Sequence, residues 1–259
     1  MSSSIFSNKK KPISKKILSV TNPNAPFNYV EAYKMLCTNL EFVAAAENCK
    51  SIGITSSLAD EGKTNIMLNL ALTLSGYGKK VCLVECDLRR PVIHRFFDAP
   101  HNIKGITNVL TGQAELHDAI KKVKEIGLSI LFAGSCPPNP SELLASERMR
   151  KLVDTLEKEY DYVIYDTPPA YVVTDAAALG KYLDGMVLII RHDSTEKAVV
   201  NKAKKNLETA GVKLLGAIYS QYNPKASGVS LNYDYYYYSS QSGSNQKSNS
   251  YEDINVGEA

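Results

Sequence analysis

The chain has 259 residues, 44% of them hydrophobic, which suits one sizeable domain with a buried core. Its formal net charge of +3 is too small to indicate a nucleic-acid partner, so we expect none. The apolar runs have the length of strands, so we expect no transmembrane helix. The basic start is not followed by an apolar stretch, so we expect no signal peptide. Five cysteines without a CxxC pair favour reduced, buried thiols in a cytosolic protein.

The first 25 residues carry a cluster of lysines and no apolar periodicity, so we expect a disordered basic tail over 1–25. A solvated tail is the favoured interpretation of these charges, and weak attraction to anionic lipid is the alternative. A helix is predicted over 29–46, directly before the first strand.

Residues 26–223 alternate short apolar strands with helical patterns. This alternation predicts an α/β domain, with a mostly parallel sheet and helices on both faces. The expected strands lie near 51–55, 80–85, 128–132, 162–165, 185–190 and 213–219. The expected helices after the first strand lie over 65–76, 141–158 and 195–210. Residues 224–259 are rich in Ser, Asn, Gln, Gly and Tyr, which predicts a flexible tail.

The sequence SLADEGKT at 57–64 predicts a phosphate-binding loop between a strand and a helix. In the pattern GxxxxGK[ST], backbone N–H groups surround the phosphates, the lysine reaches the β and γ oxygens, and the hydroxyl binds Mg²⁺. The dipole of the following helix also points at the phosphates. The pattern fails only at its first glycine, which is a serine here. The predicted nucleotide contacts are Ser57, Asp60, Glu61, Gly62, Lys63, Thr64 and Asn65.

Two acidic motifs follow the loop. The sequence VCLVECDLRRP at 81–91 delivers Glu85 and Asp87 at the end of an apolar strand, where open parallel sheets bind ligands. Strand alternation predicts that the two carboxylates share a face, so that one holds the metal or its waters while the other polarises an incoming hydroxyl. The sequence YDYVIYDTPPA at 160–170 places Asp166 at the end of another strand, as expected for an acidic partner of Mg²⁺.

The tail contains a cluster of tyrosines, although disordered segments are normally poor in aromatic residues. Beside an ATP site, this cluster is interpreted as a set of phosphoacceptors. A low-complexity end, or a strand that pairs with a partner, is the alternative. Twelve residues between Gln221 and the cluster span up to about 40 Å when extended, enough to enter a neighbouring subunit's site. The predicted acceptors are Tyr233, Tyr235, Tyr236, Tyr237 and Tyr238.

With these motifs in this order, the chain resembles the bacterial tyrosine kinases that govern capsule and exopolysaccharide synthesis. The resemblance covers roughly residues 26–238 and includes the segments at 87–97, 105–120 and 133–153. It implies that Lys63 and Thr64 contact the β and γ phosphates and Mg²⁺. It also implies that Asp87 and Asp166 belong to the metal shell and that the tail tyrosines are acceptors.

The sequence departs from the family pattern around the site. Ala59 and Asp60 replace a Pro-Gly pair in the loop, and Asp60 brings a carboxylate near the phosphates. Glu85 replaces the first Asp of the second motif, which moves its charge by one methylene. A displacement of about 1 Å can cost about 100-fold in rate. Ser220 stands where the family often has an Asn beside the adenine.

A further departure concerns self-association. Relatives assemble into rings through a Glu-x-x-Arg-x-x-Arg helix, which here reads Glu31, Lys34 and Cys37. Lysine is a poor bidentate substitute for arginine, and cysteine carries no charge. We expect self-association, with ring formation in doubt.

The predicted function is a protein-tyrosine kinase that uses ATP and Mg²⁺ to phosphorylate its own tail in trans and regulates capsular polysaccharide synthesis and export. Lys63 offsets the developing charge, and Glu85 or Asp87 accepts or orients the tyrosine proton. Arg89 and Arg90 are either cations of the site or members of surface salt bridges. The alternative is a nucleotide-switched ATPase or regulator of the same fold. Partitioning ATPases carry a signature Lys where this chain has Leu58.

The resemblance also implies partners and a location. Family kinases without a membrane segment are activated by a separate transmembrane protein, whose cytoplasmic tail docks on the kinase. We therefore expect such an activator and a cognate tyrosine phosphatase. The expected location is cytoplasmic and peripheral, at the inner face of the cell membrane.

Overall fold

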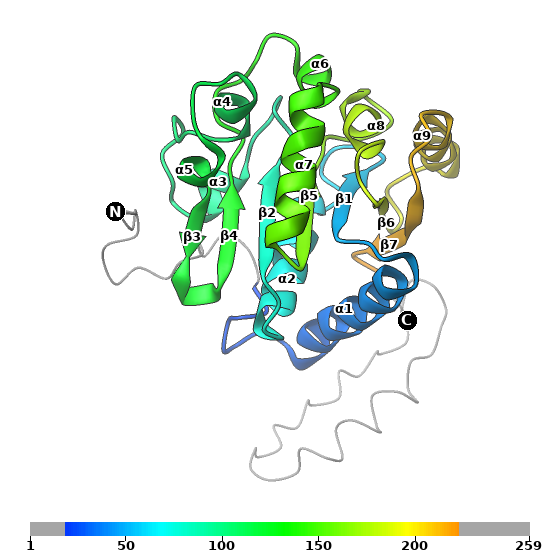
Figure 1. Ribbon diagram of the computed structural model, residues 1–259. Coiled ribbons are helices and arrows are strands. Elements are labelled where there is room, and N and C mark those ends of the chain that lie inside the picture. The colour runs from blue at the N-terminus through cyan, green and yellow to red at the C-terminus, as the bar shows by residue number, and fades with distance from the viewer. Residues whose placement is uncertain (1–18, 223–259) are drawn as a thin grey trace, which may run out of the picture. The chain divides into compact units, whose positions relative to one another are not determined.

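The computed structural model describes residues 19–222, and their core is a seven-stranded sheet (Figure 1). The strands are β1 (Ser51–Ser56), β2 (Val81–Glu85), β3 (Lys121–Val123), β4 (Leu128–Leu131), β5 (Tyr162–Asp166), β6 (Gly185–Arg191) and β7 (Leu214–Ser220). The longer helices are α1 (Phe27–Glu47), α2 (Lys63–Gly76), α7 (Glu147–Glu159) and α9 (Lys197–Thr209). Shorter helices are α3 (Ile93–Phe96), α4 (Ile106–Leu110), α5 (Leu116–Ala119), α6 (Pro140–Leu144) and α8 (Asp175–Gly180), with a 3₁₀ turn at Lys124–Ile126.

The strand order places the ends of β1, β2 and β5 next to one another. The order is β3-β4-β2-β5-β1-β6-β7, and all neighbours are parallel except the β3–β4 pair. The chain leaves β1 toward one side of the sheet and later returns to fill its other side with β6 and β7. Ligands of open parallel sheets bind at such a reversal, outside the carboxyl ends of the strands.

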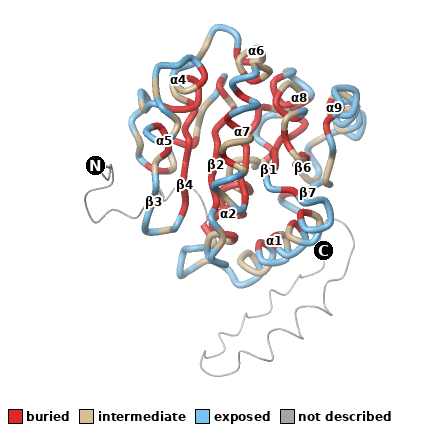
Figure 2. The backbone as a smooth tube through the Cα atoms, viewed as in Figure 1, coloured by how far each residue is buried: buried red, intermediate tan, exposed pale blue. Residues whose placement is uncertain are grey.

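Strand alternation divides the core into two layers. In β2, Val81 and Leu83 face the layer that contains α1 and α2, whereas Cys82 and Val84 face the layer that contains α7, α8 and α9. Both faces of the sheet are therefore covered by helices, and Figure 2 shows the buried strands between them. A sheet that is buried on both faces needs continuous apolar strands, as the sequence has.

The six predicted strands and the mostly parallel α/β fold are confirmed. Strand β3 was not predicted, because three residues with exposed lysines carry no apolar alternation. The helix predicted over 141–158 is two helices, since Ser146 caps α7 by accepting a hydrogen bond from the backbone N–H of Met149.

The structured part of the chain begins earlier than the predicted boundary at residue 26. Residues 19–25 form turns, and the backbone N–H of Val20 donates to Oδ1 of Asn69 on α2 at 2.8 Å. The remainder of the predicted basic tail, residues 1–18, lies outside the described residues, as does the predicted tail over 224–259. Within residues 19–222, no helix combines the length and apolar character that a membrane span needs.

Candidate active site

The loop between β1 and α2 has the backbone of an anion cradle. Asp60 and Gly62 have φ of 64° and 83°, and Gly62 is the residue before the first turn of α2. Asp60 stands where the family pattern has Gly, and Asp is among the few residues that tolerate this left-handed conformation. The departure at Asp60 therefore preserves the path of the loop, and α2 directs its N-terminus into the cleft.

The carboxylate of Glu61 holds this loop in place through hydrogen bonds. Its side chain is buried, and Oε2 accepts a hydrogen bond from the backbone N–H of Leu58 at 2.9 Å. Oε1 accepts from the hydroxyl of Thr195 and, at 3.5 Å, from the backbone N–H of Arg191. Glu61 was predicted among the nucleotide contacts, but its carboxylate joins the loop to the segment that follows β6. It is therefore a positioning residue.

Two further contacts tie the loop to the last strands of the sheet. The guanidinium of Arg191 donates to the backbone oxygen of Asp60 at 3.2 Å, and the hydroxyl of Ser220 donates to the backbone oxygen of Glu61 at 2.9 Å. Ser220, which departs from the family's Asn, is thus a support of the loop in this protein. The sequence motifs gave no signal for Arg191 or Thr195, because both contacts cross more than 130 residues.

Lys63 and Thr64 meet Asp166 at the mouth of the sheet. Nζ of Lys63 forms an ion pair with Oδ1 of Asp166, and the Thr64 hydroxyl lies 3.4 Å from Oδ2. The Asp166 side chain is completely buried and that of Lys63 is 10% exposed. The predicted juxtaposition of the loop with the end of β5 is therefore present in the structure.

Asp87 is the carboxylate of the second motif that faces the cleft. The cleft has a volume of about 360 Å³, and Asp87, Lys63, Thr64 and Arg90 are among the residues that line it. The Asp87 carboxylate accepts a hydrogen bond from the backbone N–H of Arg90 at 3.0 Å. Burial raises the pKa of Asp87 above its usual value, and the charge of Lys63 opposes this shift.

Glu85 does not share this environment. Its carboxylate is buried and accepts three backbone hydrogen bonds, from Val92 at 2.5 Å, Ile93 at 2.6 Å and Ala133 at 3.1 Å. Burial raises its pKa to about 7, although these three donors act in the opposite direction. The expectation that Glu85 and Asp87 face the same way is wrong, since β2 ends at Glu85 and the chain turns. Glu85 positions the loop that carries Asp87.

The side chains of Asn65 and Ser57 differ in their hydrogen bonds. Oδ1 of Asn65 accepts hydrogen bonds from the hydroxyls of Tyr29 at 3.1 Å and Tyr33 at 3.4 Å, and from Nδ2 of Asn69 at 3.0 Å. Asn65 thus links α1 to the start of α2. The Ser57 hydroxyl is buried without a hydrogen-bond partner within residues 19–222, and Ser57 is not among the residues that line the cleft.

The structure separates the roles of the two arginines in the second motif. Nε and Nη2 of Arg89 donate to the two oxygens of the buried Asp175, at 2.8 and 3.0 Å. The same carboxylate accepts from the hydroxyl of Ser141 on α6. Arg89 therefore joins the second motif to α6 and α8, and Arg90 is the arginine that lines the cleft. Sequence analysis missed Asp175, which no motif marks.

Three more predictions concern residues away from the cleft. The tail tyrosines at 233–238 lie outside the described residues. On α1, Glu31 forms an ion pair with Lys34 at 2.6 Å, whereas Cys37 is fully buried against α2. All five cysteines are unpaired, as predicted, but Cys136 is exposed rather than buried.

The residues fit a magnesium nucleotide on chemical grounds. Mg²⁺ prefers oxygen ligands and retains waters and phosphate oxygens. The Thr64 hydroxyl and Asp87 supply hard oxygens in the cleft, and the buried Asp166 lies directly beside Thr64. The N-terminus of α2 offers backbone donors to phosphate oxygens. This combination of strand, loop, helix and acidic strand ends defines a P-loop nucleotide-binding protein.

Comparison with known proteins narrows this class. A family profile described as AAA domain matches residues 49–198. The chain is 38% identical to "Tyrosine-protein kinase YwqD" of Bacillus subtilis over 88% of this chain and 94% of that protein. It is 35% identical to "Putative tyrosine-protein kinase CapB" of Staphylococcus aureus, over 80% and 89% of the two chains.

A solved structure agrees with these relatives. The kinase domain of the Escherichia coli tyrosine kinase ETK superposes with a TM-score of 0.75 at 34% identity, covering 80% of this chain and 81% of that chain. The chain belongs to the bacterial tyrosine kinase family, as its motifs had indicated.

Proposed function

We propose that this protein is an ATP-dependent tyrosine kinase that phosphorylates its own C-terminal tyrosines in trans and thereby regulates the synthesis and export of a capsular polysaccharide. The observation that carries the proposal is that Lys63, Thr64 and Asp87 line one cleft at the carboxyl end of the sheet, with the buried Asp166 against Lys63 and Thr64. The similarity to named tyrosine kinases over most of the chain supports it.

The chain's own groups divide the reaction between them. Lys63 and the loop N–H groups hold the β and γ phosphates and offset the charge that develops during transfer. Mg²⁺, held by Thr64, Asp87 and Asp166, supplies further charge neutralisation when bound. The tyrosine oxygen forms the new bond to the γ phosphorus as the bond to ADP breaks, and Asp87 accepts the hydroxyl proton.

Asp87 is favoured over Glu85 as the base because the Glu85 carboxylate already accepts hydrogen bonds from three backbone N–H groups. Arg90 is the cation of the second motif that is placed to contact the acceptor or the transferring group. Arg89 is held by Asp175 and is less available for that role.

Partners complete the proposal. A transmembrane activator would dock its cytoplasmic tail on the domain and hold the domain at the inner face of the membrane. A cognate phosphatase would remove the phosphates from the tyrosine cluster of this chain. We also propose self-association, since transfer in trans requires two copies. The buried Cys37 and the paired Glu31 argue against the ring contact of relatives with an arginine-rich helix.

Phosphotyrosine mass spectrometry on the full chain with Mg-ATP tests the proposal, with and without a candidate activator tail. We expect phosphate on Tyr233–Tyr238 in the wild type, none in Asp87→Asn, and wild-type levels in the matched variant Asp98→Asn. ATP binding with no phosphotyrosine under either condition would refute the kinase and favour a nucleotide-switched regulator.

A further inference from the structure

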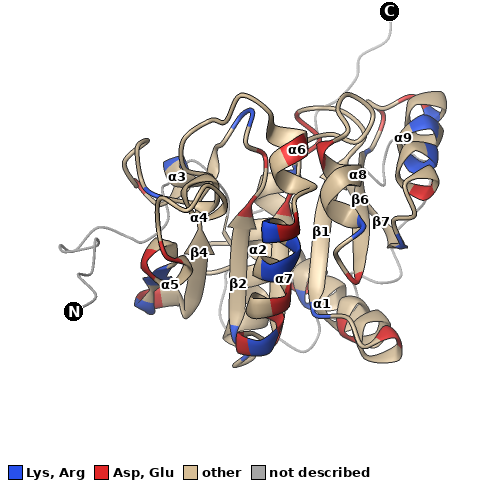
Figure 3. Ribbon diagram, turned by 45° about the horizontal axis from the view of Figure 1, so that its top comes forward, with Lys and Arg blue, Asp and Glu red and all other residues tan. Residues whose placement is uncertain are grey.

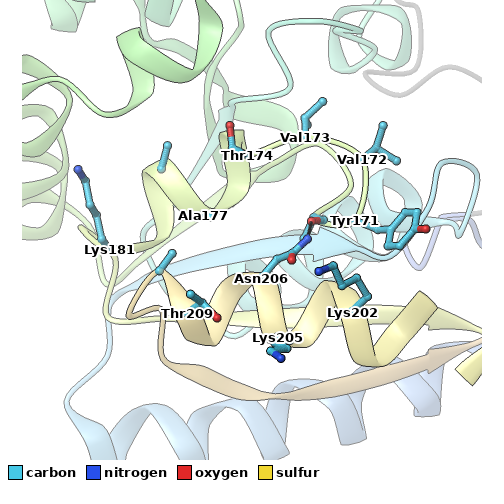
Figure 4. Close-up of a pocket in the computed structure, with 13 residues that line it drawn as sticks. Tyr171, Val172, Val173, Thr174, Ala177, Lys181, Lys202, Lys205, Asn206 and Thr209 are labelled. Carbon is cyan, nitrogen blue, oxygen red and sulfur yellow. Dashed lines mark hydrogen bonds between the residues drawn. The ribbon is translucent and has the colours of Figure 1, made fainter. Parts of the chain in front are cut away.

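A second hollow lies between α8 and α9, separate from the nucleotide cleft (Figure 4). It has a volume of about 740 Å³, which is within the range of pockets that bury most of a drug-sized ligand. One wall is the loop 170–174, which follows the Asp166 motif, and the others come from α8 and α9. It shares no lining residue with the nucleotide cleft.

The charge of this groove has one sign. Three lysines line it, Lys181, Lys202 and Lys205, and no Asp or Glu does. Within residues 19–222, none of the three forms an ion pair, although Lys204 on the same helix pairs with Glu208 at 3.5 Å. Figure 3 shows Lys and Arg positions, in blue, along the ribbon of α9. The groove is thus prepared for an anionic occupant.

The groove also offers apolar surface. Tyr171 is 44% exposed and Val172 is 61% exposed, and both belong to the loop that forms one wall. In Figure 4, Lys181 and Lys202 lie toward opposite ends of the groove, with Ala177 on the α8 wall between them. An extended segment with several anionic groups and aromatic rings matches this arrangement better than a single small ion. A phosphorylated tyrosine carries both features in one side chain.

We propose that the groove between α8 and α9 binds the tyrosine cluster of this chain, residues 233–238, once it is phosphorylated. The inference rests on the proposed function, which supplies the phosphates. Each phosphotyrosine adds about −1.5 to −2 in charge, so a cluster with several of them is strongly anionic. The lysine groove provides the opposite field. A concave surface fits a chain segment better than it fits a flat bilayer.

The groove is connected to the catalytic residues by the backbone. Nδ2 of Asn206 on α9 donates to the backbone oxygen of Ala170 at 3.1 Å, and the N–H of Ala170 donates to the oxygen of Ser56 at 2.8 Å. Ser56 is the last residue of β1, directly before the phosphate loop. An occupant that moves α9 against the 170–174 loop would therefore act on the nucleotide cleft.

Fluorescence anisotropy with synthetic peptides tests the proposal on dephosphorylated, full-length protein without ATP. The peptides cover residues 229–240, unmodified or phosphorylated on all five tyrosines. The groove variant is Lys181→Glu/Lys202→Glu/Lys205→Glu, and the matched control Lys121→Glu/Lys122→Glu/Lys124→Glu makes the same charge change at the β3 edge. A milder triple Lys→Gln variant of the groove is measured as well, and melting temperatures establish which variants are folded.

We expect the phosphopeptide to bind wild type and control alike, and the groove variants at least about tenfold more weakly, because reversing three lysine charges removes the attraction for the phosphates. The unmodified peptide should bind the wild type at least about tenfold more weakly than the phosphopeptide does. Equal binding to groove and control variants, or no binding to the wild type, would overturn the proposal. Binding of anionic vesicles that the groove variant abolishes, with no phosphopeptide binding, would assign the groove to lipid instead. Because the phosphates are supplied ready-made, these results are independent of whether the protein phosphorylates itself.

Discussion

Replacement of Lys63 by Met should destabilise the nucleotide-free protein as well as stop phosphoryl transfer. The Lys63 ammonium is paired with Asp166, whose side chain is fully buried. Methionine is close in length to lysine but leaves this carboxylate without its cation, and only the Thr64 hydroxyl remains near, at 3.4 Å. Removal of one partner of a buried pair costs about 3–5 kcal/mol. For a domain of this size, the melting temperature should fall by about 10 °C.

A double-mutant cycle isolates this effect. The variants are Lys63→Met, Asp166→Asn and their combination, with the exposed Lys122→Met as the control, and each is melted in calorimetry without nucleotide. The double variant should recover most of the stability that Lys63→Met loses, because the uncompensated charge is then absent. A Lys63→Met protein that melts within 1 °C of wild type, or additive effects in the cycle, would refute the reasoning about the buried pair.

Three other predictions follow from the burial of particular groups. Glu61→Gln should weaken ATP binding about tenfold, measured by titration, because the loop loses one charge-assisted support; unchanged affinity would contradict its positioning role. Glu85→Gln should lower the free energy of unfolding by about 1–3 kcal/mol, because the new amide N–H₂ then faces backbone N–H donors. Asp87→Asn should instead abolish phosphoryl transfer and change the free energy of unfolding by less than about 0.5 kcal/mol. In native protein, iodoacetamide should label Cys136 alone, because burial raises the pKa of Cys37 to about 12 and encloses the other thiols; a second rapidly labelled cysteine, seen by intact mass, would contradict this.

Local patterns predicted the frame of the site because they act over short distances. Six strands were marked by apolar runs, and the phosphate loop was marked by Gly62, Lys63 and Thr64 between a strand and a helix. The meeting of Asp166 with Lys63 followed from the rule that parallel strands present their carboxyl ends at one edge. Strand β3 and the break before Ser146 escaped, since a three-residue edge strand and a single capping hydroxyl give little periodic signal.

The sequence by itself determined six of the seven strands of residues 19–222, where the phosphate loop lies and which acidic side chains end the central strands. Only the tertiary structure decided which of those carboxylates are free for chemistry. Glu85 and Glu61 look like site residues in the motifs, yet each accepts backbone hydrogen bonds from a neighbouring loop and from a distant segment. The physical reason is that a buried carboxylate is costly unless it accepts hydrogen bonds. The N–H groups that donate to it can lie up to 130 residues away in the sequence, so only the tertiary structure identifies them.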